Sequence, residues 1–290
     1  MSAEIGIPPH LRITDGKNFR LSSIDTHDKL GREKLTSRTR IRDCVDRMAV
    51  LQGRLAAYAS NGILVVLQGM DAAGKGGAVR HAFSGLNPAG VRVTSFKAPG
   101  PVEKRHDDLW RIHVAMPSRG EIGIFNRSHY EDVLIERVHP YMVRARVLDP
   151  DAPGFWENRL EDLRNFETYL TRQNILVVKL FLHISPQKQR KRLLKRLDQP
   201  EKRWKFDPSD LAERQLWPAY TQAYEEAIRA TATPEAPWYI IPADRKWLTR
   251  VMVAEALLAT LESLHLKEPS ADFSPALKAA QEALLKDGHN

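Results

Sequence analysis

Cysteine is nearly absent from this sequence: among its 290 residues only Cys44 is a cysteine. One cysteine excludes an internal disulfide and suits a reducing compartment, and we expect Cys44 to act as a small buried apolar residue. Long apolar runs are missing too, since none approaches the roughly 18 residues that a membrane-spanning helix needs. The first residues, MSAEIGIPPH, lack the basic-then-apolar pattern of a secretion signal. We therefore expect a cytoplasmic protein that does not act in a membrane.

Zinc-binding patterns and internal repeats are also missing. The chain has 10 histidines, yet none stands with other histidines or with Cys44 at a spacing typical of a zinc site. We therefore interpret His129 and His183 as hydrogen-bonded structural residues. Since no repeat or low-complexity linker divides the chain, we expect one folded domain rather than an array of modules.

Negative charge is the scarcer of the two signs. The sequence has 44 lysines and arginines against 36 aspartates and glutamates, which gives a net charge of +8 and a pI of about 9.6. Such an excess attracts polyanions, whether nucleic acid, an anionic membrane or a phosphate-rich ligand. The basic residues gather around a glycine-rich loop near residue 75 and at 188–205, so an anionic ligand is favoured over a merely solvated surface.

Apolar runs that suit β-strands alternate along the chain with segments of helical periodicity. This alternation predicts an α/β fold in which helices cover both faces of a parallel sheet. We expect an N-terminal arm over residues 1–32, one α/β domain over 33–265, and a C-terminal tail over 266–290 with a short helix at 276–285. The expected strands are 63–67, 91–96, 122–125, 176–184 and 238–241, and the expected helices are 33–60, 76–84, 102–115, 129–136, 155–172, 186–198, 209–231 and 244–264.

The first expected strand runs directly into a glycine-bounded loop with the sequence GMDAAGKGG. Strand, loop and lysine in this order predict a phosphate site rather than an inert turn, because backbone N–H groups and a helix N-terminus point at the anion. Lys75 adds a full positive charge. Gly76 replaces the Ser or Thr whose hydroxyl usually holds Mg²⁺, so Asp71 is the nearest candidate ligand for the metal. The phosphate-binding backbone is expected at Gly69, Met70, Ala72, Ala73, Gly74, Gly76 and Gly77.

A second candidate segment, residues 122–132, begins as an apolar strand and ends in polar side chains. Open parallel sheets bind ligands at the carboxyl ends of their strands, and in phosphate-transferring enzymes an acidic residue at this place holds Mg²⁺. A structural interpretation stays open beside this one, since Ser128 with Glu131 three residues later fits a capping box at a helix start. The functional candidates are Asn126, Arg127, Glu131 and Asp132.

The third feature is a run of positive charge, QKQRKRLLKRL at 187–197, which is followed by KRWK at 202–205. A charge run is usually a solvated helix face, and that interpretation stays open. Because the run follows the fourth strand, where P-loop kinases carry an arginine-bearing lid, we favour phosphate binding, for which the planar guanidinium is suited. The expected members are Lys188, Arg192, Lys195, Arg196, Arg203 and Lys205, with Arg80, Lys97 and Arg137 as further cations near the same anion.

The chain resembles the polyphosphate kinase 2 family in five separated segments that occur in matching order. They are GMDAAGKGG, NPAGVRVTSFKAP, FNRSHYEDVL, FLHISPQKQRKRLLKRLDQPEKRWKF and APWYIIPADRKW, and the resemblance covers about residues 35–265. The form FNRSHYEDVL is similar to the subgroup termed class III, whose members phosphorylate nucleoside mono- and diphosphates from inorganic polyphosphate. The resemblance implies a three-layer P-loop kinase of the thymidylate-kinase type, with a five-stranded parallel sheet and a helical lid over about 198–215.

The resemblance also implies roles for individual residues. Lys75 and the loop amides would bind phosphates, and Asp71 would serve the metal and the acceptor phosphate. Arg127 and Arg192 match the positions for the transferring phosphoryl group and the polyphosphate chain, while Glu131 and Asp132 match the acidic pair of the subgroup. The chain departs from the family in two places. Many relatives carry Asp where Asn126 stands, which passes the Walker-B role to Asp132 or Glu131, and many read GKDG where this chain has Gly76.

The implied function is reversible, direct in-line phosphoryl transfer from polyphosphate to AMP, ADP or both, assisted by Mg²⁺ with Mn²⁺ as an alternative ion. The implied partners are polyphosphate and adenine nucleotides, with guanine nucleotides as an alternative, in a homodimer or homotetramer; neither nucleic acid nor a membrane is expected. The residues agree with this, because a channel of lysine and arginine without base-reading groups suits a long phosphate chain. Two rival functions stay open: a nucleotide kinase that uses ATP as donor, and a basic nucleic-acid-binding module that keeps the loop as scaffold.

Overall fold

The structure, a computed structural model, describes residues 6–146, 148–269 and 275–287. Its centre is a six-stranded sheet with the order β1-β6-β5-β2-β4-β3. The strands are β1 (Arg12–Ile13), β2 (Gly62–Gln68), β3 (Val91–Ser95), β4 (Ile122–Asn126), β5 (Ile175–His183) and β6 (Trp238–Pro242). Strands β2 to β6 correspond to the predicted strands and run parallel, whereas β1 pairs antiparallel with β6. The prediction of a five-stranded parallel sheet is therefore wrong in its extent, because the sheet is mixed and has six strands.

The central strands form because their side chains are apolar on both faces. Every residue of β2, GILVVLQ, is buried, and β5, ILVVKLFLH, is nearly as apolar. A continuous apolar run of this kind is typical of a parallel strand between two helical layers. The prediction missed β1 because a strand of two residues leaves no periodic signal in the sequence.

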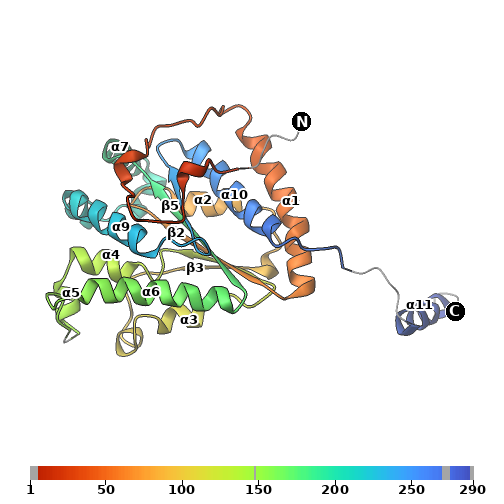
Figure 1. Cartoon of the computed structure of the whole chain (residues 1–290). Helices are drawn as coiled ribbons and strands as arrows, with labels where there is room; N and C mark the ends of the chain where they lie inside the picture. Colours follow the sequence, from red (N-terminus) through yellow and green to blue (C-terminus); the bar gives the residue numbers. More distant parts are fainter. Residues whose placement is uncertain (1–5, 147, 270–274, 288–290) are drawn as a thin grey trace.

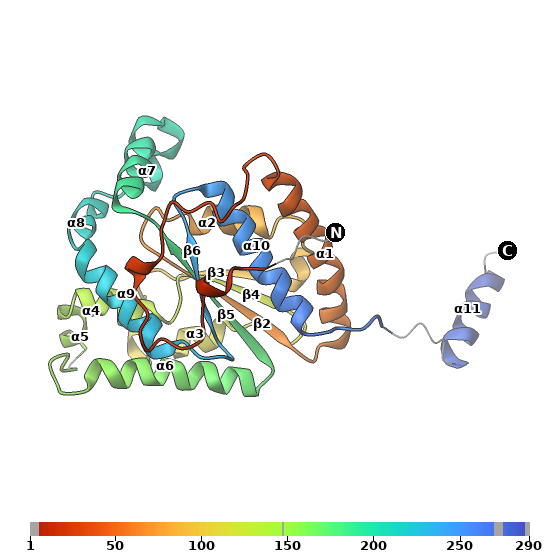
Figure 2. The same cartoon turned by 45° about the horizontal axis from the view of Figure 1, so that its top comes forward.

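Helices cover both faces of the sheet (Figures 1 and 2). Helices α1 (Ser37–Tyr58), α2 (Lys75–Ala82) and α10 (Lys246–Ser263) pack together on one face, and α4 (Glu131–Val138), α6 (Phe155–Arg172) and α9 (Trp217–Thr231) pack together on the other. Helix α7 (Pro186–Asp198) projects from the body, and α11 (Pro275–Asp287) lies apart from it. The short elements are α3 (Trp110–Ala115), α5 (Tyr141–Arg144), α8 (Ser209–Gln215), and the 3-10 turns η1 (Pro9–Leu11), η2 (Leu21–Ser23), η3 (Pro88–Gly90), η4 (Glu103–Arg105) and η5 (Pro200–Lys205).

Two of the predicted helices are interrupted. The predicted helix 209–231 consists of α8 and α9, because Pro218 in the first turn of α9 lacks the N–H that a continuing helix needs. The predicted helix 102–115 consists of η4 and α3. Between them Asp107 Oδ1 accepts a hydrogen bond from Leu109 N at 3.0 Å, a local turn that competes with the helix.

The N-terminal segment, residues 6–32, packs on the body and contributes to its core. Leu11, Phe19, Leu21 and Ile24 are buried in the same apolar cluster as the sheet. Arg229 Nε of α9 donates to Phe19 O at 2.7 Å. The segment predicted as an arm is therefore tied to the sheet and to α9.

Two expectations that came from missing features can be compared with the structure. Cys44 lies in α1 with 1% of its surface exposed, and burial raises the pKa of its thiol to about 11. The prediction of a small buried apolar residue is confirmed. Within the described ranges, no helix combines the length and the apolar character that crossing a bilayer requires.

Candidate active site

The phosphate loop joins β2 to α2, and two of its glycines are required by the backbone. Gly69 has a φ of 143°, and a Cβ at this position would lie 2.7 Å from Leu182 O. Gly74 has a φ of 112°, which L-residues with side chains rarely adopt. A Cβ at Gly76 or Gly77 would meet nothing within 4 Å. Lack of space is therefore not the reason why position 76 has no Ser or Thr.

Lys75 begins α2 and turns its ammonium group back over the loop. Its Nζ donates to Gly69 O at 2.5 Å and lies 3.4 Å from Met70 O. Burial, and then the positive charge of Arg127, lowers the pKa of Lys75 to about 8, although two nearby carboxylates act in the other direction. Lys75 is therefore protonated at neutral pH, and its partners are neutral carbonyls that an anion can replace.

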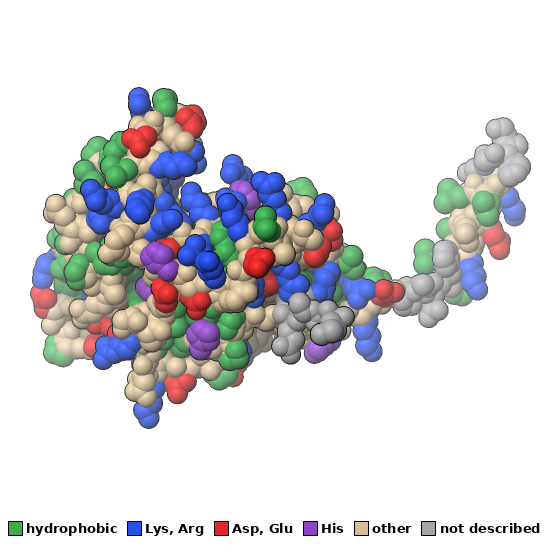
Figure 3. Space-filling view, turned by 90° about the horizontal axis from the view of Figure 1, so that it is seen from above, with side chains coloured by type: hydrophobic (Ala, Val, Ile, Leu, Met, Phe, Trp, Pro, Cys, Tyr) green, Lys and Arg blue, Asp and Glu red, His purple; other side chains and the backbone are tan. Residues whose placement is uncertain are grey.

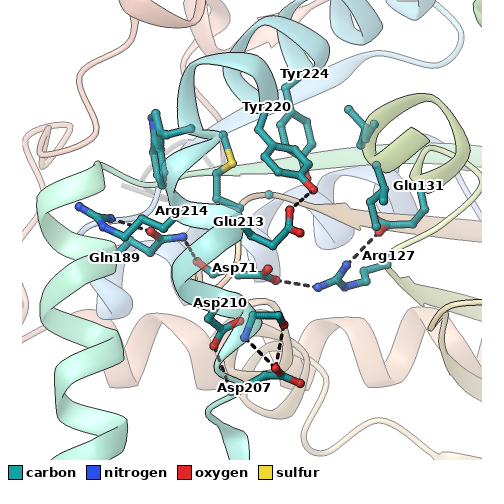
Figure 4. A pocket seen from close by; sticks show the side chains of 16 residues that line it. Asp71, Arg127, Glu131, Gln189, Asp207, Asp210, Glu213, Arg214, Tyr220 and Tyr224 are labelled. Atoms are coloured by element: carbon teal, nitrogen blue, oxygen red, sulfur yellow. Dashed lines mark hydrogen bonds and ion pairs between the residues drawn. The ribbon is translucent and has the colours of Figure 1, made fainter. Parts of the chain in front are cut away.

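Arg127 follows β4 and lies between two carboxylates (Figure 4). Its Nη2 is 2.6 Å from Asp71 Oδ1, and its Nη1 is 2.9 Å from Glu131 Oε2. Burial opposes the charge of the guanidinium, but the two carboxylates outweigh it and raise the pKa of Arg127. Its φ of 66° is uncommon outside glycine, and such strain clusters at functional sites. The loop and the end of β4 thus meet in one charged group.

Glu131, the first residue of α4, turns toward Arg127 and the sheet. Its Oε1 accepts a hydrogen bond from Gln68 Nε2 at 3.1 Å. Ser128 Oγ accepts from Gln68 Nε2 at 3.1 Å and from Tyr130 N at 3.2 Å. These partners differ from those of a capping box, so the functional interpretation of Glu131 is favoured over the structural one.

Asp132 stands next to Glu131 in the sequence, but its side chain points toward α3. Its Oδ1 is 3.7 Å from Arg111 Nη2, and its Oδ2 has no hydrogen-bond partner among the described residues. Burial raises the pKa of Asp132 to about 7, although Arg111 opposes this. The structure does not bring together the predicted metal set of Asp71, Glu131 and Asp132. In the part of the chain that it describes, no three acidic, histidine or cysteine side chains form a metal-binding group.

Arg192 reaches the loop from α7, but its guanidinium is buried against the backbone. Its Nη1 donates to Ala72 O at 2.9 Å and to Ala73 O at 2.6 Å, and its Nη2 donates to Ala243 O at 2.5 Å. Burial lowers the pKa of Arg192 to about 10. The resemblance implied that Arg192 contacts the polyphosphate chain, whereas in the structure its guanidinium is buried and donates to backbone carbonyls of the loop and of the turn after β6.

The rest of the basic run lies on the projection formed by α7 and η5 (Figure 2). Arg196 Nη1 donates to Lys205 O at 3.1 Å, and Arg203 Nε donates to Leu197 O at 2.8 Å. Seen from above, Lys and Arg side chains gather at the foot of this projection and on the adjoining body (Figure 3). The expected basic surface is therefore present, but these hydrogen bonds of Arg203 and Lys205 stay within the projection.

Further predicted residues lie outside the group of the loop and Arg127. Asn126 ends β4, where its Nδ2 donates to Ser95 Oγ at 3.2 Å. Arg80 on α2 and Lys97 after β3 are exposed. Arg137 in the last turn of α4 lies 3.4 Å from Glu226 Oε2, away from the loop. Of these residues, Asn126 shares its strand end with Arg127.

A cavity of about 340 Å³ opens beside Asp71 and Arg127 (Figure 4). Trp217, Tyr220 and Tyr224 of α9 form an aromatic wall, which the sequence reasoning missed although their spacing of three and four residues is helical. Carboxylates outnumber cations around this cavity. The acidic lining residues are Asp71, Glu131, Asp207, Asp210 and Glu213, and the basic ones are Arg127 and Arg214.

A buried polar network holds the segment between Arg127 and Glu131. Glu167 Oε1 accepts from Tyr130 Oη at 2.7 Å and lies 3.2 Å from His129 Nε2, and Glu167 Oε2 accepts from Lys179 Nζ at 2.5 Å. The prediction that His129 is a hydrogen-bonded structural residue is confirmed. Buried ion pairs add little stability over apolar packing, so we interpret this network as a support that fixes the backbone beside Arg127.

Comparisons with a family model, with curated proteins and with solved structures agree with one another. A family model described as Polyphosphate kinase 2 (PPK2) matches residues 31–269. A curated protein of Rhodopseudomonas palustris, named ADP-polyphosphate phosphotransferase, is 44% identical over 232 residues, which cover 79% of this chain and 80% of that protein. One of Meiothermus ruber, named AMP/ADP-polyphosphate phosphotransferase, is 48% identical over 223 residues, with 77% and 80% covered. The crystal structure of polyphosphate kinase 2 from Arthrobacter aurescens TC1 matches with a TM-score of 0.87 and 41% identity over 96% of each chain.

Proposed function

This chain belongs to the polyphosphate kinase 2 family, and from that premise we propose that it transfers a phosphoryl group from inorganic polyphosphate to AMP, ADP or both. The observation that carries the proposal is the position of Arg127 between Asp71 and Glu131, beside Lys75 and the loop. Transfer between two phosphates requires positioning and charge neutralisation more than a covalent catalyst. These residues supply both.

Each side chain has a part in this reaction. Lys75 exchanges its loop carbonyls for donor phosphate oxygens and neutralises them. Arg127 offers a planar fork to the phosphoryl group in transfer. The acceptor is already a phosphate anion, so no strong general base is needed, and transfer is direct and in line.

Asp71 and Glu131 also fit a divalent cation. Mg²⁺ is usually held by one or two carboxylates together with phosphate oxygens and water, and these two carboxylates lie on either side of one guanidinium. When bound, the ion neutralises charge on the transferring phosphoryl group. We therefore assign Mg²⁺, or Mn²⁺ as the alternative, to Asp71 and Glu131 and not to Asp132.

The lid and the assembly belong to the same proposal. Asp207, Asp210 and Glu213, which lie within 198–215, line the cavity, and this supports a lid in that segment of a thymidylate-kinase-like fold. Arg214 Nη1 donates to Gln189 Oε1 at 2.7 Å and thereby joins α8 to α7.

We also propose adenine nucleotides as the preferred acceptors and a homodimer or homotetramer as the working form.

The test is a nucleotide panel with Mg²⁺ and long-chain polyphosphate as the phosphoryl source. We expect ATP from ADP, ADP from AMP, or both. Lys75→Ala should lower the rate about a thousandfold or more, because it removes the main cation of the loop, while the melting temperature changes little. Lys278→Ala, at an exposed position of α11, is the matched control and should behave as the wild type.

Three outcomes would contradict the proposal. Phosphorylation with ATP but not with polyphosphate would favour an ordinary nucleotide kinase. Tight, salt-sensitive oligonucleotide binding that survives Lys75→Ala, without any phosphoryl transfer, would favour a nucleic-acid-binding module. Normal turnover in the Lys75→Ala variant would refute the assignment of the site.

A further inference from the structure

We infer that the N-terminal segment positions the phosphate loop through Asp244, and that Thr26 and His27 are therefore positioning residues for binding at the loop. Thr26 and His27 lie outside the site described above. The kinetic test of their role rests on the proposed function, whereas the structural test does not. The connection has three links, each made by hydrogen bonds or close polar contacts.

The first link joins the N-terminal segment to the turn after β6. Asp244 is 2% exposed, and its Oδ2 accepts from Thr26 Oγ1 at 3.1 Å and lies 2.8 Å from His27 Nδ1. The backbones are joined as well, since Asp244 N donates to Thr26 O at 3.3 Å. Arg245 Nε donates to His27 O at 3.1 Å. The segment thus holds both the carboxylate and the backbone of this turn.

The second link joins Asp244 to the start of α7. Asp244 Oδ1 accepts from Ser185 N at 2.9 Å, and Oδ2 accepts from Ser185 Oγ at 2.8 Å. Ser185 is the N-cap of α7, since its Oγ accepts from Lys188 N at 3.1 Å. The buried carboxylate therefore fixes where α7 begins, and the N-terminal segment supplies two of the contacts that orient this carboxylate.

The third link joins α7 to the loop. Gln189 Nε2 donates to Asp71 O at 3.1 Å, and Arg192 Nη1 donates to the carbonyls of Ala72 and Ala73. Gln189 is 4% and Arg192 9% exposed. A displacement of α7 must therefore move the backbone of residues 71–73.

This part of the loop needs support from outside. Ala72 has a φ of 60°, a left-handed conformation that a residue with a side chain keeps only when its surroundings impose it. The carbonyl of Ala72 is held by Arg192 at 2.9 Å. Small misplacements of a binding group cost large factors in rate or affinity. Loss of a contact in any of the three links should therefore weaken binding of phosphate at the loop.

The kinetic test removes the contacts that the side chains of Thr26 and His27 make in the first link and changes no residue of the site. The double variant Thr26→Val/His27→Ala keeps the branched shape at position 26 but removes the two side-chain contacts that the N-terminal segment makes to Asp244 Oδ2. We expect the KM for polyphosphate to rise about tenfold, which corresponds to the loss of one charge-assisted hydrogen bond, with kcat and the nucleotide KM changed less than about twofold. Thr26→Ser in otherwise wild-type protein should keep the wild-type KM, because it retains the hydroxyl.

The matched control is Arg20→Ala, which breaks a contact of the same segment at 2.8 Å with Glu225, outside the three links. It should leave the KM for polyphosphate unchanged. If the control raises this KM as much as the double variant does, the effect belongs to general loosening of the segment and the inference fails. It also fails if the double variant lowers kcat and the melting temperature while the KM stays constant.

The structural test needs no substrate. Hydrogen exchange of the loop amides, residues 69–77, followed by mass spectrometry, should be faster in Thr26→Val/His27→Ala than in the wild type, and unchanged in Arg20→Ala. Unchanged loop exchange in the double variant overturns the inference, whatever the enzyme's activity. Faster loop exchange in a protein that proves inactive with polyphosphate supports the inference and refutes the proposed function instead.

Discussion

Arg127 and Arg192 both contact the phosphate loop, but the structure gives them different partners. The side chain of Arg127 is 35% exposed and lies between two carboxylates, whereas Arg192 is 9% exposed and donates to backbone carbonyls. Substrate phosphates can compete for a guanidinium that carboxylates hold in partial contact with water. They cannot reach the buried guanidinium of Arg192 without displacing the backbone that surrounds it. Under the proposed function, Arg127 therefore contacts the phosphoryl group, whereas Arg192 holds the backbone of the loop.

The surfaces near these two arginines also differ, in the sign of their charge. Carboxylates dominate the cavity beside Arg127, while Lys and Arg side chains gather at the foot of the α7 projection (Figure 3). Under the proposed function, the polyphosphate chain lies on the basic side, and the metal and the acceptor lie on the acidic side. The following predictions test this division, from the largest expected effect to the smallest.

Arg127→Ala should produce the largest effect on the rate. Loss of an arginine that stabilises a transferring phosphoryl group lowers kcat about a thousandfold, while the free energy of unfolding changes by less than about 1 kcal/mol since the residue is partly solvated. Steady-state kinetics and urea unfolding check both. Arg127→Lys is the control: it keeps the charge but loses the fork, so it should recover only a small part of the rate. Full recovery by lysine would contradict bidentate binding.

Arg192→Ala should reverse this pattern. Removing the buried guanidinium leaves the carbonyls of the loop unsatisfied, which lowers the free energy of unfolding by about 2–4 kcal/mol. The KM for polyphosphate should rise more than that for the nucleotide, because the loop loses its support. Arg203→Ala, in the same basic projection, is the control and should leave the stability within about 0.5 kcal/mol of the wild type. An Arg192→Ala protein of normal stability with a large loss of kcat would place Arg192 in the chemistry after all.

Lys75 should give activity and stability opposite dependences on pH. Its pKa of about 8 means that kcat/KM for polyphosphate falls about tenfold per pH unit above that value, as the ammonium loses its proton. Folding responds in the other direction: between pH 8 and the ordinary lysine pKa the unfolded chain binds more protons, so this residue's contribution to stability rises with pH. Comparing wild type with Lys75→Met by urea unfolding at several pH values isolates that contribution. A kcat/KM for polyphosphate that stays constant up to pH 10 would contradict the lowered pKa of Lys75.

Asp132→Asn should have the smallest effect on the rate, within about threefold, because the carboxyl lies outside the cavity; a loss of a metal ligand would cost far more. The substitution should also change how the free energy of unfolding depends on pH. Burial raises the pKa of Asp132 to about 7, so ionising it costs the native state stability as pH rises from about 4 to 7. The asparagine variant should therefore gain more relative to the wild type at pH 8 than at pH 5. Glu131→Gln is the comparison, and we expect it to impair turnover strongly.

Much of the fold was predictable because its signals are local. The apolar run of β2, the glycines at 69 and 74 and the lysine at 75 follow from strand burial, positive φ and helix-end electrostatics. The pairing of Arg127 with Asp71 was not predictable in detail, yet the rule that ligand groups meet at the carboxyl ends of parallel strands placed both near the same edge.

The errors came from contacts between distant segments. The sequence shows Arg192 in a basic run, but only the packing of α7 against the loop and the turn after β6 makes it a buried donor to carbonyls. Asp132 and Glu131 are neighbours in the sequence, but side chains on successive helical positions face different directions, toward Arg111 and Arg127. The break before α9 was readable from Pro218, whereas β1 had no signal of its own.

Strand β1 has a consequence for how copies of this chain can join. In the described part of the chain the sheet has two edge strands, β1 beside β6 and β3 beside β4, to which a strand of another molecule could add. Strand β1 is two residues long, and β3 is five residues long and exposes Arg92; short or charged edge strands oppose such pairing. We therefore expect the subunits of the proposed homodimer or homotetramer to meet through helices and loops rather than through a continued sheet.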